Sequence, residues 1–151
     1  AYAFSTEGII GYSIGLKKKK LFTNAVKNSF ILSSFTGLAI SIFYLFSKDV
    51  FINFMTDIES IKNISFQFSF WLILLPFLSS FCYQFDGIFI GASQTKELRD
   101  AMFISVTIYL LSSYFLVQNF GNQGLWISFT IFLILRALTL GFYFKRIYLK
   151  F

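Results

Sequence analysis

The sequence predicts an all-α protein, a polytopic bundle of transmembrane helices. Hydrophobic residues make up 56% of the chain and charged residues only 13%, whereas typical soluble domains are about 25% charged. Several apolar stretches are bounded by charged residues and are long enough to cross a bilayer, which takes ~20 apolar residues. The ~10-residue segments of alternating hydrophobicity that are typical of outer-membrane barrels are absent.

Five membrane segments are expected, joined by short connections into one compact bundle without a second domain. The first is expected to be truncated, because the opening residues resemble a helix already under way. They lack the basic region and cleavage pattern of a signal peptide, so the chain is expected to be a fragment. The predicted spans are about 1–16, 28–47, 66–92, 101–117 and 124–144.

Charged residues delimit these segments. The first ends at a run of four lysines, and the second and third each lie between two lysines. The fourth begins after a cluster of basic and acidic residues, and an uncharged turn separates it from the fifth. The basic residues that bound the segments are Lys17, Lys18, Lys19, Lys20, Lys27, Lys48, Lys62, Lys96, Arg99 and Lys145.

The distribution of basic residues predicts the orientation in the membrane. The first and third connections and the C-terminal tail together carry ten basic residues, whereas the second and fourth connections carry two. The positive-inside rule therefore predicts a multi-pass protein of the cell (inner) membrane with a cytoplasmic C-terminus. Trp71 and Trp126 then fall near the outer interface, where amphipathic aromatic rings are enriched.

Composition also excludes several functions. The net charge of +6 does not indicate nucleic acid as a partner, because the basic residues flank apolar runs. The run 17–20 is expected to be a topology anchor; its alternative is a patch for anionic lipid or nucleic acid. The chain has no histidine and one cysteine, Cys82, and no nucleophile beside a base. We therefore expect that the protein is not an enzyme and that it has no cofactor and no metal site. Its expected partners include membrane lipids.

Three charged residues lie inside the predicted spans: Glu7, Asp86 and Arg136. Each precedes the basic residue that closes its segment by nine or ten positions, so all three are expected ~14 to 15 Å above the inner flank. That level is near the middle of a ~30 Å hydrocarbon core, where transporters usually bind substrates and coupling ions. The shared depth predicts an ion-coupling or substrate-binding site, with H+ or Na+ as the coupling ion.

A structural role is the alternative for these charges. Asp86 and Arg136 can form a buried ion pair that fixes helix packing, a common use of such residues in membranes. In that case neither side chain moves an ion. The sequence leaves both interpretations open.

The residues around Asp86 suggest how the segment would serve transport. Pro76, Gly87 and Gly91 offer local helix flexibility for alternating access, although proline kinks also occur in rigid membrane helices. A subset of Tyr83, Phe85 and Phe89 is a candidate for lining a substrate cavity; otherwise these rings face lipid or the core. Gly11 and Gly15 form a face of small residues, which is typical of close helix packing.

Three blocks of sequence carry a family resemblance. The middle block runs from Phe85 to Thr95 as FDGIFIGASQT and continues with LRDAM at 98–102. The first runs from Glu7 as EGIIG, followed by Ile14-Gly15, and the last is GNQGLW at 121–126 together with Arg136. In this order and spacing the chain resembles the multidrug and toxic compound extrusion family, particularly its DinF-like branch.

The resemblance implies a twelve-helix, two-lobed transporter. This chain would supply the end of helix eight and helices nine to twelve, part of the C-terminal lobe, and its partner would be the missing N-terminal lobe of the same chain. Members of the family export cationic or amphipathic compounds by antiport against H+ or Na+. Asp86 matches a carboxylate that some members use for cation binding, whereas the proton site of the DinF-like branch lies in the first lobe.

Two other functions remain as alternatives. A lipid-linked oligosaccharide flippase of the same superfamily would need several cationic residues in its cavity to hold a pyrophosphate, and this chain offers Arg136 alone within its spans. A membrane packing subunit without transport activity would need the intramembrane charges only for structure.

Overall fold

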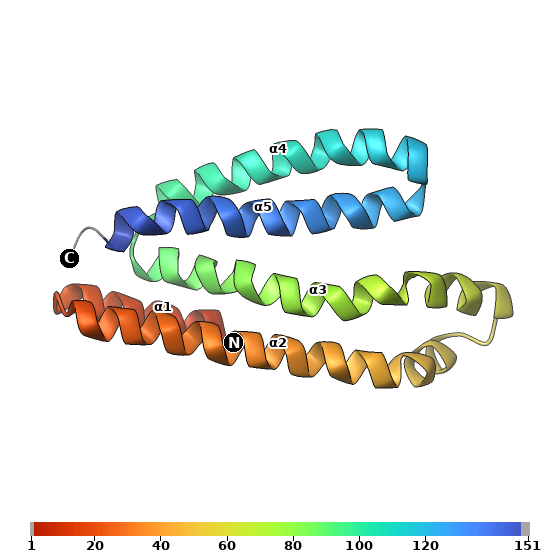
Figure 1. The fold of residues 1–151 in the computed structure, drawn as a ribbon, viewed down its shortest axis with the longest axis horizontal. Helices are drawn as coiled ribbons and strands as arrows, with labels where there is room; N and C mark the ends of the chain where they lie inside the picture. Colours follow the sequence, from red (N-terminus) through yellow and green to blue (C-terminus); the bar gives the residue numbers. More distant parts are fainter. Residues whose placement is uncertain (1, 149–151) are drawn as a thin grey trace.

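The structure is a computed structural model that describes residues 2–148, and these form five α-helices joined by short turns. Consecutive helices run in opposite directions along one long axis (Figure 1). The expected all-α helix bundle is confirmed. The helices are α1 (Tyr2–Gly15), α2 (Lys19–Met55), α3 (Glu59–Gly91), α4 (Thr95–Phe120) and α5 (Asn122–Tyr148).

Four of these helices, α2 to α5, are long and apolar enough to cross a membrane, and this is a multi-pass membrane protein. All four begin before the predicted spans. α2 has 37 residues and begins within the lysine run, because lysine is a good helix former and the backbone stays helical past the apolar stretch. Residue Ala1, the start of the first predicted span, lies outside the described residues.

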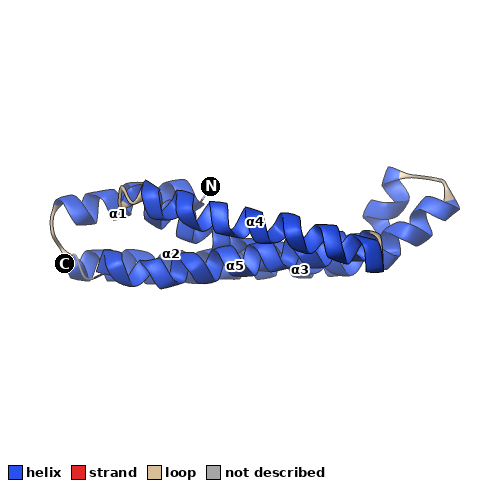
Figure 2. Cartoon of the chain, turned by 90° about the horizontal axis from the view of Figure 1, so that it is seen from above, coloured by secondary structure: helices blue, strands red, loops and turns tan. Residues whose placement is uncertain are grey.

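α3 is the central helix of the described bundle. It contacts α1 and α2 on one side and α4 and α5 on the other, and α4 and α5 pair with each other (Figure 1). The tip of the α2–α3 hairpin bends away from the remaining helices (Figure 2). Side chains carried by α3 can therefore reach residues from every other helix.

The apolar core lies at one end of the bundle and joins all five helices. It consists of Ile10, Phe22, Ile88, Phe89, Ala92, Ala101, Leu140 and Ile147. Phe22 of α2 stacks on Phe144 of α5 at 6.0 Å between ring centroids. At the same end, the Lys19 ammonium lies 4.3 Å from the centre of the Tyr148 ring. Buried side chains thus hold the five helices together at the end of the bundle that the charge pattern assigns to the cytoplasm.

Glycines allow α1 and α3 to pack backbone against backbone. A methyl group on Gly91 would lie 2.5 Å from the Glu7 carbonyl oxygen, and one on Gly87 would overlap the Ala3 backbone. Gly11 faces Gly91 as well, since a methyl group on Gly11 would lie 3.4 Å from the Gly91 carbonyl oxygen. Such contacts between small residues are typical of membrane helices. The sequence interpretation assigned Gly87 and Gly91 to flexibility, and their packing role was not predicted.

Candidate functional site

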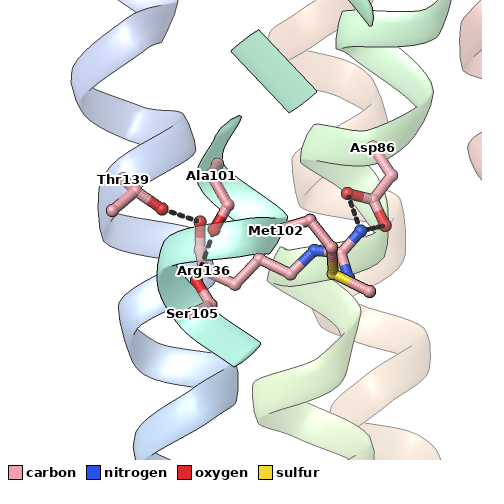
Figure 3. Close-up of polar contacts among 6 residues, drawn as sticks. All are labelled: Asp86, Ala101, Met102, Ser105, Arg136 and Thr139. Carbon is pink, nitrogen blue, oxygen red and sulfur yellow. Dashed lines mark hydrogen bonds and ion pairs between the residues drawn. The ribbon is translucent and has the colours of Figure 1, made fainter. Parts of the chain in front are cut away.

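Asp86 of α3 and Arg136 of α5 form an ion pair within the bundle. The Arg136 Nη2 group donates to both carboxylate oxygens of Asp86, at 3.0 and 2.9 Å (Figure 3). The two side chains are only 16% and 13% exposed. This is the buried ion pair that the structural interpretation of the two charges predicts. In this conformation Arg136 neutralises the charge of the Asp86 carboxylate.

The other nitrogens of Arg136 tie the pair to α4. Nη1 lies 2.7 Å from the Met102 sulfur, which is a weak acceptor, and Figure 3 shows the guanidinium reaching past Met102 toward Asp86. The Nε atom is buried and has no hydrogen-bond partner within residues 2–148. Arg136 therefore joins three helices while one of its donors remains unsatisfied, an arrangement that costs free energy in a water-poor site.

A groove of about 500 Å³ lies between α1, α2 and α3, on the side of Asp86. We call it the α1–α3 groove. Its walls include both intramembrane carboxylates. The lining residues are Tyr2, Ala3, Phe4, Glu7, Ser33, Thr36, Gly37, Ile40, Pro76, Ser79, Ser80, Tyr83, Gln84, Asp86, Gly87 and Ile90. None of these is basic; Arg136 reaches Asp86 from α5, which does not line the groove.

Glu7 differs from Asp86 in its surroundings. It is half-buried in the wall of the groove, and within residues 2–148 its side chain has no hydrogen bond and no ion pair. The three charges predicted to share one level are thus brought together as a neutral pair and one free carboxylate. Groups of three or more His, Cys, Asp or Glu side chains suited to a metal are absent from residues 2–148.

Hydroxyl groups in the groove were not predicted. Ser33 and Thr36 come from α2, and Ser79 and Ser80 from α3. Their sequence signal was the spacing of Ser33, Thr36 and Gly37, which places three small or polar residues on one face of an otherwise apolar helix. Gln84 is also buried and donates to the Thr6 hydroxyl at 2.6 Å, which joins α3 to α1.

One of the three candidate aromatic residues lines the groove. Tyr83 does so and is exposed, whereas Phe85 packs on Phe30 with 4.9 Å between ring centroids, and Phe89 is fully buried in the core. Helical spacing explains the difference. Positions 83, 86, 87 and 90 share the groove face of α3, so positions 85 and 89 turn toward α2 and α5. Pro76 lines the groove within the continuous helix α3.

The family model called MatE matches residues 1–117, most of the chain. The chain belongs to the multidrug and toxic compound extrusion (MatE) family. This MatE chain is also 28% identical over 145 residues to the DNA damage-inducible protein F of Escherichia coli (strain K12), and the match covers 96% of the chain. The expected resemblance to the DinF-like branch is confirmed.

The chain spans about a third of the length of that relative, since the match covers 31% of it. No solved structure matches the chain. The MatE match includes α1, α2, α3 and most of α4, and therefore both carboxylates of the groove, while Arg136 lies beyond it.

Proposed function

We propose that this chain is part of a secondary active exporter that moves cationic or amphipathic compounds out of the cell in exchange for H+ or Na+. Membership of the MatE family supports transport across a membrane. The observation that carries the proposal is the groove between apolar helices that holds Asp86 and Glu7. A carboxylate within a membrane segment is costly and is retained mainly where ions or substrates pass.

Asp86 would couple ion binding to movement of the helices, because its carboxylate would exchange Arg136 for the ion. Arg136 is the internal counter-ion of Asp86, and a proton or sodium ion bound at the carboxylate would take its place. The guanidinium would then leave Asp86 and loosen the contact of α3 with α5 and Met102 of α4. When the ion leaves, the pair would re-form. Ion binding shifts the conformation to the extent that the ion binds one of the two states more tightly than the other.

The two alternatives fit the groove less well. A flippase for pyrophosphate-linked lipids needs cationic side chains in its cavity, and the residues that line this groove include none. A packing subunit would use the Asp86–Arg136 pair in the same way as a transporter, but an unpaired Glu7 in the membrane would serve no purpose in it. We therefore propose that the substrate binds in the groove. The protein would lie in the cell membrane with its C-terminus in the cytoplasm, as the basic residues predict.

The test uses the full-length protein, including the N-terminal lobe, in proteoliposomes. Efflux of a cationic dye is measured under an imposed proton or sodium gradient for wild type and Asp86→Asn. We expect Asp86→Asn to abolish gradient-driven efflux, compared at equal amounts of inserted protein because the change also leaves the buried Arg136 charge without its partner. Asp57→Asn, an exposed residue of the α2–α3 turn, is the control and should transport normally. Efflux that persists in Asp86→Asn would exclude the coupling role.

A further inference from the structure

We propose that the outer end of the bundle holds a site for a phospholipid, whose ester carbonyl groups accept hydrogen bonds from the wall of a pocket. The pocket has a volume of about 540 Å³, and it lies between the α2–α3 hairpin and the start of α5, separate from the α1–α3 groove. We call it the outer pocket. Its lining residues are Ile52, Met55, Thr56, Ile61, Ser65, Phe68, Ser69, Leu72 and Trp126.

The outer pocket lies where the helices leave the hydrocarbon core. The 37 residues of α2 make ~55 Å of helix at 1.5 Å per residue, whereas the hydrocarbon core is ~30 Å thick. The tip of the α2–α3 hairpin therefore extends past the core, and it bends away from the remaining helices (Figure 2). Trp126 lines the pocket from the second turn of α5. This is the level of the interfacial region, in which the ester groups of a bilayer lie.

The wall of the outer pocket offers hydrogen-bond donors that have no acceptor. The Trp126 Nε1 group is buried and has no hydrogen-bond partner within residues 2–148. By contrast, Trp71 at the same end of the bundle donates from its Nε1 group to the Gln123 side-chain oxygen at 2.9 Å. A buried indole N–H normally finds such a partner, and one that is left without it costs free energy. A ligand that accepts a hydrogen bond from Trp126 removes this cost.

Two hydroxyl groups in the same wall are also available as donors. The Thr56 oxygen accepts a hydrogen bond from the backbone N–H of Ile58 at 3.3 Å, and its own proton has no acceptor in the described part of the chain. Ser65 forms no side-chain hydrogen bond with any residue between positions 2 and 148. Ester and phosphate oxygens only accept hydrogen bonds. A phospholipid therefore complements the donors of this wall.

The rest of the outer pocket suits acyl chains. Ile52 and Ile61 come from the two arms of the hairpin, and Leu72 lies deeper on α3 and is 40% exposed. On α5, the exposed Phe129 is one turn beyond Trp126 on the same face, so it continues the apolar surface toward the centre of the membrane. The pocket can take the glycerol ester region of a lipid while its chains run along this surface.

The outer pocket does not suit a cationic compound. Acidic and basic side chains are absent from its lining among residues 2–148, whereas the α1–α3 groove holds two carboxylates. A cation would lose its hydration in the pocket without gaining a counter-ion. The charged headgroup of a phospholipid avoids this cost, because it can remain in the water-rich interface above the ester groups.

The test is a competition between two lipids that differ only in the ester carbonyl groups. Diphytanoylphosphatidylcholine has an ester carbonyl on each chain, and di-O-phytanylphosphatidylcholine has ether links in their place. The full-length protein is delipidated in detergent and mixed with equal amounts of both, and native mass spectrometry measures how much of each lipid stays bound. Trp126→Phe keeps a ring and removes the donor, and Thr56→Val with Ser65→Ala removes the two hydroxyl groups. Tyr114→Phe is the matched control, because Tyr114 is an exposed ring of α4 outside the pocket.

We expect wild type and Tyr114→Phe to retain the ester lipid with a preference of about three- to tenfold over the ether lipid, the scale of one neutral hydrogen bond. Trp126→Phe should retain both lipids equally. The variant Thr56→Val with Ser65→Ala should show a lower preference than wild type, so the result does not depend on one substitution. Without lipid, Trp126→Phe should melt no lower than wild type, since the change removes a buried donor that lacks a partner.

Equal retention of the two lipids by wild type, retention of neither, or a preference that persists in Trp126→Phe would overturn the inference. Displacement of the ester lipid by tetraphenylphosphonium, an amphipathic cation, would also overturn it and assign the pocket to a transported compound. These outcomes are independent of the proposed function, because the experiment applies no gradient and measures no transport.

Discussion

Gly91 of α3 and Glu7 of α1 are in direct backbone contact, close enough that a methyl group on Gly91 would lie 2.5 Å from the Glu7 carbonyl oxygen. The absence of a side chain at Gly91 therefore sets the distance between the two helices at this level. Because Asp86 lies slightly more than one helical turn from Gly91, the same contact brings both carboxylates to one groove. Helix packing and the chemistry of the site are linked at this point.

Substitution of Gly87 by alanine should destabilise the packing of α1 on α3. The added methyl group would overlap the Ala3 backbone, and overpacking of this kind costs ~1 to 3 kcal/mol. We expect a lower melting temperature for the full-length protein in detergent. It is measured by heating samples and quantifying the protein that remains monodisperse in size-exclusion chromatography. Gly8→Ala on α1 is the control, because nothing lies within 4 Å of a methyl group there, and its stability should be unchanged or higher.

Loss of Arg136 should destabilise the protein more than loss of an exposed arginine. Arg136→Leu leaves a buried carboxylate without its partner, a change that costs ~3 to 5 kcal/mol in comparable pairs. Arg99→Leu is the control, because Arg99 pairs with Asp100 at the same 2.9 Å but their side chains are 72% and 41% exposed; such pairs contribute about 1 kcal/mol or less. The measurement is the amount of folded protein recovered from membranes.

The double variant Arg136→Leu with Asp86→Asn then isolates the ion pair. Asparagine is neutral and similar in shape to aspartate, so it removes the buried charge that Arg136→Leu leaves unpaired. Recovery of folded protein should return toward the wild-type amount. If the double variant is as unstable as Arg136→Leu alone, the defect comes from lost packing against Met102 and not from the charge on Asp86.

Thr6→Val should destabilise the contact between α1 and α3 through Gln84. The Gln84 amide donates to the Thr6 hydroxyl at 2.6 Å, and a buried amide left without a partner costs ~1 to 3 kcal/mol. Thr23→Val is the control, since Thr23 is exposed and bonds only within its own helix. Thermal unfolding that is equal for the two variants would show that this bond contributes nothing.

Cysteine labelling should report the orientation of the bundle. Cys82 is 1% exposed and should not react with a membrane-impermeant maleimide until the protein is denatured. In a full-length protein without other cysteines, Lys18→Cys should be labelled from the cytoplasmic side only. Asn122→Cys, at the exposed first residue of α5, should be labelled from the outside only. The opposite pattern would refute the orientation derived from the basic residues.

The number of helices was predictable because charged residues separate the apolar runs, except for the last two, which an uncharged polar turn separates. The pairing of Asp86 with Arg136 was also foreseen as one of two interpretations, since two opposite charges at one depth in a bilayer attract each other strongly. Both predictions depend on single residues whose chemistry is unusual inside a membrane. Neither requires knowledge of which helix faces meet.

The groove could not be predicted, because the sequence does not distinguish faces that touch lipid from faces that touch protein. Phe4 is 79% exposed and Phe22 is fully buried, yet both are phenylalanines in apolar helices. In a soluble protein, polar residues would mark the outer face; in a membrane both faces are apolar. The wall that holds Glu7, Ser33 and Ser80 forms only when the helices are packed together.

The central place of α3 has a consequence for how the bundle would move. Asp86 lies on the helix that touches each of the other four within the described residues. A proton that binds to this carboxylate would therefore affect both sides of the bundle. It would weaken the contact of α3 with the α4–α5 hairpin and change the electrostatic potential in the α1–α3 groove. One binding event would therefore act on helices on both sides of α3 directly.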